Sequence, residues 1–173
     1  MPTSRSPSSA APSAASSRDA IKLLTDDHKA VKALFKKYDS LAGAGAEAEE
    51  RQALAQQICD MLTVHATVEE EIFYPAAREV LGDDEDLVDE ADIEHACAKE
   101  LIAQIQAATA DSSHYDAMVK VLGEYIAHHV LEEEGEMFPK AKKSGLDAKT
   151  LGAAIHRRKE QLTVELAGAT EAS

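Results

Sequence analysis

The sequence predicts an all-α fold, an up-down-up-down four-helix bundle followed by one additional helix. Three observations lead to this prediction. Hydrophobic residues make up 45% of the 173 residues but aromatic residues only 4%, and the abundant Ala, Leu, Glu and Lys favour helix over strand. Apolar residues recur at the spacing of an amphipathic helix. The connections between these periodic segments are short, which makes neighbouring long helices antiparallel.

The helices follow one another between turn signals. Each of the first four is expected to end at such a signal, in chain order at Gly43-Ala44-Gly45, Gly82-Asp83-Asp84, Asp111-Ser112-Ser113 and Ser144-Gly145. The five helices are expected over about residues 17–41, 47–80, 86–110, 114–142 and 147–166. Pro75 is expected to break or bend the second helix, and Pro139 lies near the end of the fourth.

One folded domain is expected over residues 18–167. Residues 1–17 are almost entirely Ser, Ala and Pro, and they lack the continuous apolar stretch of about 7–15 residues that a signal peptide needs. We interpret this segment as a disordered tail. Residues 168–173 are expected to be frayed.

The charge balance argues against two classes of partner. The net charge is −14 and the pI is about 4.8. Nucleic acids and anionic membrane surfaces both attract clustered Lys and Arg, so neither is expected as a partner. No apolar run approaches the roughly 18–20 residues of a membrane span. The two cysteines, Cys59 and Cys97, make no disulfide framework, which favours a reducing cytoplasm as the compartment.

Seven histidines, as many as all the aromatic residues together, are the unusual feature of the composition. Because an α-helix turns about 100° per residue, each histidine can be placed relative to the apolar face of its helix. His28, for example, shares its face with Leu24 and Val31. Four buried imidazoles need compensation, which a metal would supply for all of them at once. The inward histidines, one on each of the first four helices, are His28, His65, His95 and His129.

Two glutamates indicate the kind of metal. Glu69 follows His65 by four residues and Glu133 follows His129 by four, which places each Glu about 40° from its His. An unpaired carboxylate in a core is costly, so a cation between the two is expected. Mixed imidazole and carboxylate ligands fit iron or manganese better than structural zinc.

An internal repeat relates the two halves of the chain. The segment 65–75 matches the segment 129–139, with identical His-to-Glu and His-to-Pro spacings. In the preceding helices a lysine follows the inward histidine by four residues, Lys32 after His28 and Lys99 after His95. The repeat predicts a pseudo-twofold bundle with a pair of metal ions at its centre.

These segments resemble the hemerythrin-like, HHE cation-binding family. The likeness extends over roughly residues 20–142 and is carried by Asp26–Phe35, His65–Pro75, Glu94-His95 and His128–Pro139. It implies a four-helix bundle around a non-haem di-iron centre with two bridging carboxylates. Carried over residue by residue, the ligands of the two Fe ions are His28, His65, Glu69, His95, His129 and Glu133.

One position departs from the oxygen-carrying members of that family. They have a second His one turn after the third-helix His, where this chain has Lys99. The remaining ligand is left open among His128, His156, Glu132 and solvent. His129 is favoured over His128 as the inward residue, because the face centred on His128 carries Glu124 and Gly135.

Several neighbouring residues are expected to have no part in the site. Glu70, Glu71 and Glu134 rotate away from the inward face and are expected on a solvated acidic surface. Tyr74, next to Pro75, is expected to pack in the core. His156 lies in a basic run, 155–159, that is expected to face solvent.

The favoured function is a non-haem di-iron protein that binds O₂ or a related small oxidant, for storage, sensing or detoxification. Two alternatives remain open: a di-iron enzyme that consumes peroxide or nitric oxide, and a protein that buffers or senses iron without turnover. A ferritin-like oxidase is rejected because its site needs Glu-x-x-His on two helices, and the nearest match is a single Asp92-x-x-His95. The sequence does not identify an electron donor or the oligomeric state.

Overall fold

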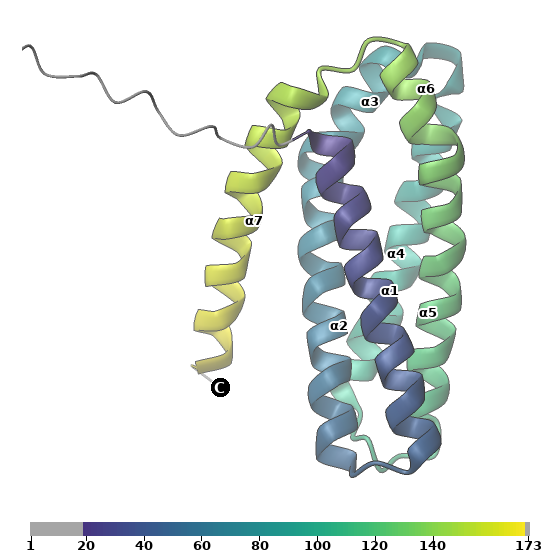
Figure 1. Cartoon of the computed structure of the whole chain (residues 1–173), viewed down its shortest axis with the longest axis vertical. Coiled ribbons are helices and arrows are strands. Elements are labelled where there is room, and N and C mark those ends of the chain that lie inside the picture. Colours follow the sequence, from purple (N-terminus) through teal and green to yellow (C-terminus); the bar gives the residue numbers. More distant parts are fainter. Residues whose placement is uncertain (1–18, 172–173) are drawn as a thin grey trace, which may run out of the picture.

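Four long helices run up and down in succession and form the bundle (Figure 1). They are α1 (Ala20–Ala44), α2 (Ala48–Val68), α4 (Asp86–Ala107) and α5 (Tyr115–Glu132). The computed structural model describes residues 19–171, and within this range it contains no strand. The predicted all-α bundle with an additional C-terminal helix is confirmed. The segment predicted to be a disordered tail lies outside the described residues.

Local signals set the ends of α1. The Asp19 carboxylate accepts a hydrogen bond of 3.1 Å from the backbone N–H of Lys22, which satisfies one of the free donors in the first turn. Gly45 ends the helix with φ at +69°, a left-handed conformation that glycine adopts without strain. The chain then turns directly into α2.

The second and fourth predicted helices are each divided by a π-helical segment. After α2 come η1 (Glu69–Phe73) and α3 (Tyr74–Leu81), and after α5 come η3 (Glu133–Met137) and α6 (Phe138–Lys143). Pro75 and Pro139 lie in the first turns of α3 and α6, where a proline needs no helical N–H partner. The break expected near Pro75 is therefore present. A short 3₁₀ turn, η2 (Gly82–Asp84), connects α3 to α4.

The apolar core is divided into two clusters along the bundle. One contains Leu24, Val88 and Phe138, and the other contains Val31, Ile102 and Ile126. His28 lies between Leu24 and Val31 on the same face of α1 and is buried. A layer of buried polar side chains therefore separates two apolar regions.

The additional helix, α7 (Ala148–Glu171), packs on the outside of the bundle against α1 and α2 (Figure 1). Ile155 anchors it, since this side chain is fully buried in the same cluster as Leu24. Of the segment predicted to fray, residues 168–171 are helical, and residues 172–173 lie outside the described residues. None of the helices among residues 19–171 is both long enough and apolar enough to cross a membrane.

Candidate metal centre

All six side chains predicted as metal ligands meet in the buried polar layer. The histidines come from α1, α2, α4 and α5, and the two glutamates are the first residues of η1 and η3. None of the six is more than 6% exposed. They are His28, His65, Glu69, His95, His129 and Glu133.

The donor atoms form two adjoining groups. In the first, His28 Nε2 lies 3.0 Å from His65 Nε2 and 3.3 Å from Glu133 Oε2. His65 Nε2 lies 3.1 Å from Glu69 Oε2. The ligand atoms of His28, His65, Glu69 and Glu133 all lie within 4.8 Å of one another.

The second group repeats this arrangement on the other side. His95 Nε2 lies 3.1 Å from His129 Nε2 and 3.4 Å from Glu69 Oε2. His129 Nε2 lies 3.5 Å from Glu133 Oε2. Each glutamate therefore faces one histidine of its own half and one of the other half. This is the arrangement in which two carboxylates can bridge two cations.

The π-helical segments begin at the two glutamates. In both, the N–H that follows the segment bonds five residues back, from Tyr74 to the Glu69 carbonyl and from Phe138 to the Glu133 carbonyl. A proline follows each of these residues, and its ring would crowd a regular α-helical turn. The wider turn relieves that crowding, and single π turns are frequent at functional sites. No π turn was expected from the sequence, and the identical Glu-to-Pro spacing in the two halves is the signal that could have indicated it.

The outward nitrogen of each of the four inward histidines has a carboxylate partner. His28 Nδ1 lies 2.8 Å from Glu134 and His95 Nδ1 lies 3.0 Å from Glu70. The prediction that Glu70 and Glu134 belong to a merely solvated surface was wrong. Both side chains do turn away from the inward face, as predicted, but each reaches a histidine on another helix.

The other two histidines take partners from the residue before an inward histidine. His65 Nδ1 lies 3.3 Å from Asp27, and His129 Nδ1 lies 2.7 Å from Glu94. Both contacts cross between helices, so a single helix cannot reveal them. Such carboxylate partners orient a metal-binding imidazole and make it a better ligand.

These hydrogen bonds test whether the site suits a cation. An imidazole that donates from Nδ1 to a carboxylate presents a lone pair at Nε2. The Nε2 atoms of His28 and His65, 3.0 Å apart, then face each other with two lone pairs and no proton between them. Glu69 Oε1, Glu69 Oε2 and Glu133 Oε2 are buried without any hydrogen-bond partner. Converging lone pairs and unpaired buried carboxylate oxygens fit cations bound between them.

The pKa shifts of the buried groups also fit a cation site. Burial and the adjacent Glu133 carboxylate raise the pKa of Glu69 well above its usual range. Burial lowers the pKa of His95 to about 4, with a further contribution from His129, so that His95 is neutral near pH 7. Neutral imidazole is the form that binds a metal.

Tyr74 breaks the twofold symmetry of the site. Its hydroxyl donates to Glu133 Oε1 over 2.9 Å and lies 3.2 Å from His95 Nε2. The prediction that Tyr74 only packs was incomplete. The repeat places Phe138 at the matching position, where its ring stacks on His28 with the centroids 5.9 Å apart. A phenol is thus present on the His95 side, and Phe138 takes its place on the His28 side.

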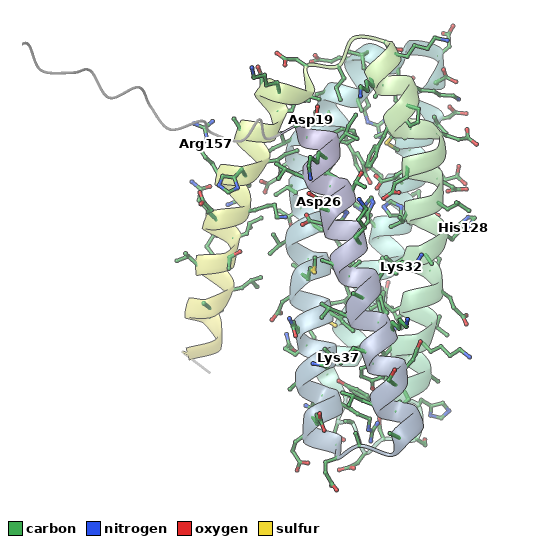
Figure 2. All side chains as sticks on the ribbon, viewed as in Figure 1. Asp19, Asp26, Lys32, Lys37, His128 and Arg157 are labelled. Atoms are coloured by element: carbon green, nitrogen blue, oxygen red, sulfur yellow. The ribbon has the colours of Figure 1, made fainter. Side chains whose placement is uncertain are left out.

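The residues left open as a further ligand lie outside the centre. The side chain of His128 is 62% exposed and lies 3.3 Å from Glu132 on the surface (Figure 2). His156 pairs with Glu160 on α7. Lys99, one turn after His95, binds both oxygens of Glu70 at 2.5 and 2.6 Å.

A small apolar cavity adjoins the inward histidines. It measures about 20 Å³ and is bordered by all four of them together with Val31, Ile126 and Lys99. A larger pocket of about 350 Å³ lies between α1 and α5 and opens to the surface beside Lys32 and Lys120. His28, Val31, Ile126 and Val130 border both spaces. The two spaces therefore share a mostly apolar wall next to the centre.

Comparison with known proteins gives three findings. Residues 19–141 match the sequence profile of the hemerythrin HHE cation binding domain. The chain is similar to a hemerythrin HHE cation binding domain-containing protein from Mycobacterium kansasii, with a TM-score of 0.67, 23% identity, and 83% of this chain and 86% of that one covered. It is also 31% identical over 114 residues to a DNA nickase of Nostoc sp. (strain PCC 7120 / SAG 25.82 / UTEX 2576). That match covers 65% of this chain and 30% of the nickase.

Proposed function

The chain belongs to the hemerythrin HHE cation-binding family, and on that premise we propose that it is a non-haem di-iron protein that binds O₂ or a related small oxidant. One observation carries the proposal. The Nε2 atoms of four imidazoles converge with the unpaired carboxylate oxygens of Glu69 and Glu133 in a buried layer. His28 and His65 would hold one ion, His95 and His129 the other, and both glutamates would bridge. Two bound iron ions would supply redox chemistry toward the oxidant.

The choice of iron is supported by the ligand set. Four neutral imidazoles with two shared carboxylates suit iron or manganese, whereas structural zinc favours four ligands that often include thiolates. The centre contains no cysteine, since Cys59 lies in the apolar core and Cys97 is exposed. The two cysteines are both free, which supports a reducing cytoplasm as the compartment.

The apolar surroundings favour a small uncharged ligand. The cavity beside the four histidines is lined by Val31, Leu62, Ala66 and other apolar side chains, and it shares His28, Val31, Ile126 and Val130 with the pocket between α1 and α5. These side chains exclude bulk water, while the four outer carboxylates hold the imidazoles in place. O₂ has the size and polarity that these apolar surroundings favour.

Peroxide consumption is the second candidate, and Tyr74 favours it. Its hydroxyl lies within the donor cluster, where it donates to Glu133. Burial raises the pKa of Tyr74 well above 10, so the phenol keeps its proton near pH 7. A neutral phenol at this place can deliver a proton to a small oxidant, which makes turnover a chemical option.

We do not extend the function of the Nostoc nickase to this chain. The match covers 30% of that protein, and a net charge of −14 disfavours binding to a phosphate backbone. The partners we propose are the small oxidant and an electron donor that remains to be identified.

Metal analysis and absorption spectra of the iron-loaded chain test the proposal. We expect about two iron ions per chain and a change in the spectrum when O₂ is admitted to the reduced protein. Reversal of that change under vacuum would favour storage or sensing, and loss of added peroxide would favour the enzyme. A chain that holds iron but responds to neither oxidant would leave only iron buffering.

The position of Lys99 yields a further prediction. Lys99 borders the cavity beside His95 and is held by Glu70, so the ligand position that a second histidine occupies in the oxygen carriers is open here. We expect Lys99→His to fill it and to slow peroxide consumption about tenfold, the scale of a change beside a metal ligand. Peroxide consumption by the iron-loaded variant is the measurement.

Lys99→Met is the matched control, because it removes the same contact with Glu70 without adding an imidazole. Peroxide consumption should fall further in Lys99→His than in Lys99→Met. Equal rates in the two variants would show that the charge on Lys99 matters and that no ligand position is open there.

A further inference from the structure

The C-terminal helix contributes a lysine to the surroundings of the metal centre. Residues 19–141 carry the family match, so α7 lies beyond it. Lys159 of α7 nevertheless contacts Asp27 of α1, with its Nζ 2.5 Å from each carboxylate oxygen. Asp27 in turn faces Nδ1 of His65. A chain of contacts thus leads from α7 to the Nε2 lone pair of His65.

The other half of the site contains the same chain of contacts. Lys99 binds both oxygens of Glu70, and Glu70 faces His95 Nδ1 at 3.0 Å. Each proposed metal ion therefore has one histidine whose outer carboxylate is held by a lysine. In the second half the lysine comes from within the bundle, on α4, whereas in the first half it comes from α7. The internal repeat does not supply the lysine of the first half. Lys32, which the repeat matches to Lys99, borders the pocket between α1 and α5.

We propose that Lys159 is a positioning residue that fixes the Asp27 carboxylate against His65, so that α7 completes the metal centre. The inference rests on the proposed metal-binding function. Asp27 lies near the surface, with its side chain 14% exposed, and its contact with His65 Nδ1, at 3.3 Å, is the longest of the four such contacts. Without Lys159 the carboxylate can turn toward solvent and leave His65 without its orienting partner.

A role in docking alone is separable, because other residues hold α7 in place. Ile155 is buried in the core, and Arg158 binds both oxygens of Glu71 at 2.6 and 3.1 Å. The hydrogen bonds and ion pairs of Asp27 in the described part of the chain go to His65 and Lys159. Arg157 lies on the outer side of α7 and is exposed (Figure 2). Arg157, Arg158 and Lys159 are consecutive, so three neighbouring substitutions can be compared. Of the three, Lys159 is the residue that contacts Asp27, which faces His65.

The experiment compares Lys159→Met, Arg158→Met and Arg157→Met in the full chain, with Co²⁺ as the probe metal. We expect Lys159→Met to weaken one of two Co²⁺ binding steps about tenfold and leave the other unchanged. Lys159→Arg should restore most of the loss, and Arg158→Met and Arg157→Met should bind as wild type. Lys99→Met should weaken the other step, and the Lys159→Met/Lys99→Met double variant should weaken both.

The sign of the effect distinguishes positioning from simple charge. Removing a positive charge near a cation should tighten Co²⁺ binding if Lys159 acts through its field alone. Tighter or unchanged binding in Lys159→Met would therefore overturn the proposal, as would an equal loss in Arg158→Met. Such an equal loss would reduce the role of Lys159 to docking of α7.

A second measurement needs no metal. The ¹⁵N signals of the His65 ring in the metal-free chain should show a proton on Nδ1 in wild type and a mixed population in Lys159→Met. An identical His65 spectrum in both would contradict the inference. A wild-type chain that binds no Co²⁺ or iron would instead contradict the proposed function, and the ring signals would still test the contact.

Discussion

Replacement of both Glu69 and Glu133 by alanine is expected to reduce metal binding from about two ions per chain to none. The two carboxylates lie between the histidine pairs, with Glu69 Oε2 3.1 Å from His65 and 3.4 Å from His95. They are the only negative charges inside the donor cluster of the described residues. Without them, two adjacent cations would repel each other, and the nearest negative charges would be the outer carboxylates on the far side of the imidazoles.

Metal analysis after iron loading is the measurement, with melting of the metal-free variant as a check on folding. Glu79→Ala combined with Glu136→Ala is the matched control, since it removes the same charge from exposed positions. That control should retain both ions. Two bound irons in the Glu69/Glu133 variant would refute the assignment of the bridging residues.

The inward histidines could be predicted because each depends only on the helical repeat. His28 follows Leu24 by four residues and precedes Val31 by three. At about 100° per residue all three side chains lie on one face of α1, and His28 is buried there. The same reasoning placed Glu69 and Glu133, because the helix is still regular up to the residue that starts each π turn. The fold and the six central side chains therefore followed from periodicity and the repeat.

The outer carboxylates could not be predicted in the same way. Asp27 contacts His65 and Glu94 contacts His129 across helix interfaces, which depend on how the helices pack. Glu70 and Glu134 do turn away from the inward face, with side chains 29% and 38% exposed. Their contacts with His95 and His28 cross between helices, so the facing of one helix does not show them. Lys159 belongs to a basic run that resembles any solvated helix face, and only the docking of α7 brings it to Asp27.

Removal of the metal is expected to lower the melting temperature by about 8–16 °C. Binding to the native state alone stabilises it by ~4 kcal/mol at a free metal concentration a thousand times the dissociation constant. A chain of this size shifts by about 2–4 °C for each kcal/mol. Mn²⁺ is a suitable probe metal, and the measurement is the melting temperature with and without it.

The stabilisation by metal should also grow as the pH rises from 6 to 7.5. Burial and Glu133 raise the pKa of Glu69 in the folded, metal-free chain. Burial lowers the pKa of His129, but the nearby Glu133 and Glu94 outweigh that effect and leave it raised. A raised folded-state pKa gives stability that is present below the unfolded pKa and is lost as the pH rises through the folded value.

A bound metal must displace the protons held by Glu69 and His129. Its contribution to the stability of the folded chain therefore increases as a higher pH makes those protons easier to remove. For one displaced proton the increase is ~1.4 kcal/mol per pH unit, or about 2 kcal/mol over this interval. His95, whose pKa burial lowers to about 4, adds nothing above pH 6, and burial also lowers the pKa of His65. We therefore expect the gap between loaded and metal-free melting temperatures to widen by about 4–8 °C between pH 6 and 7.5. A gap that stays constant or narrows would show that no proton is held where the metal binds.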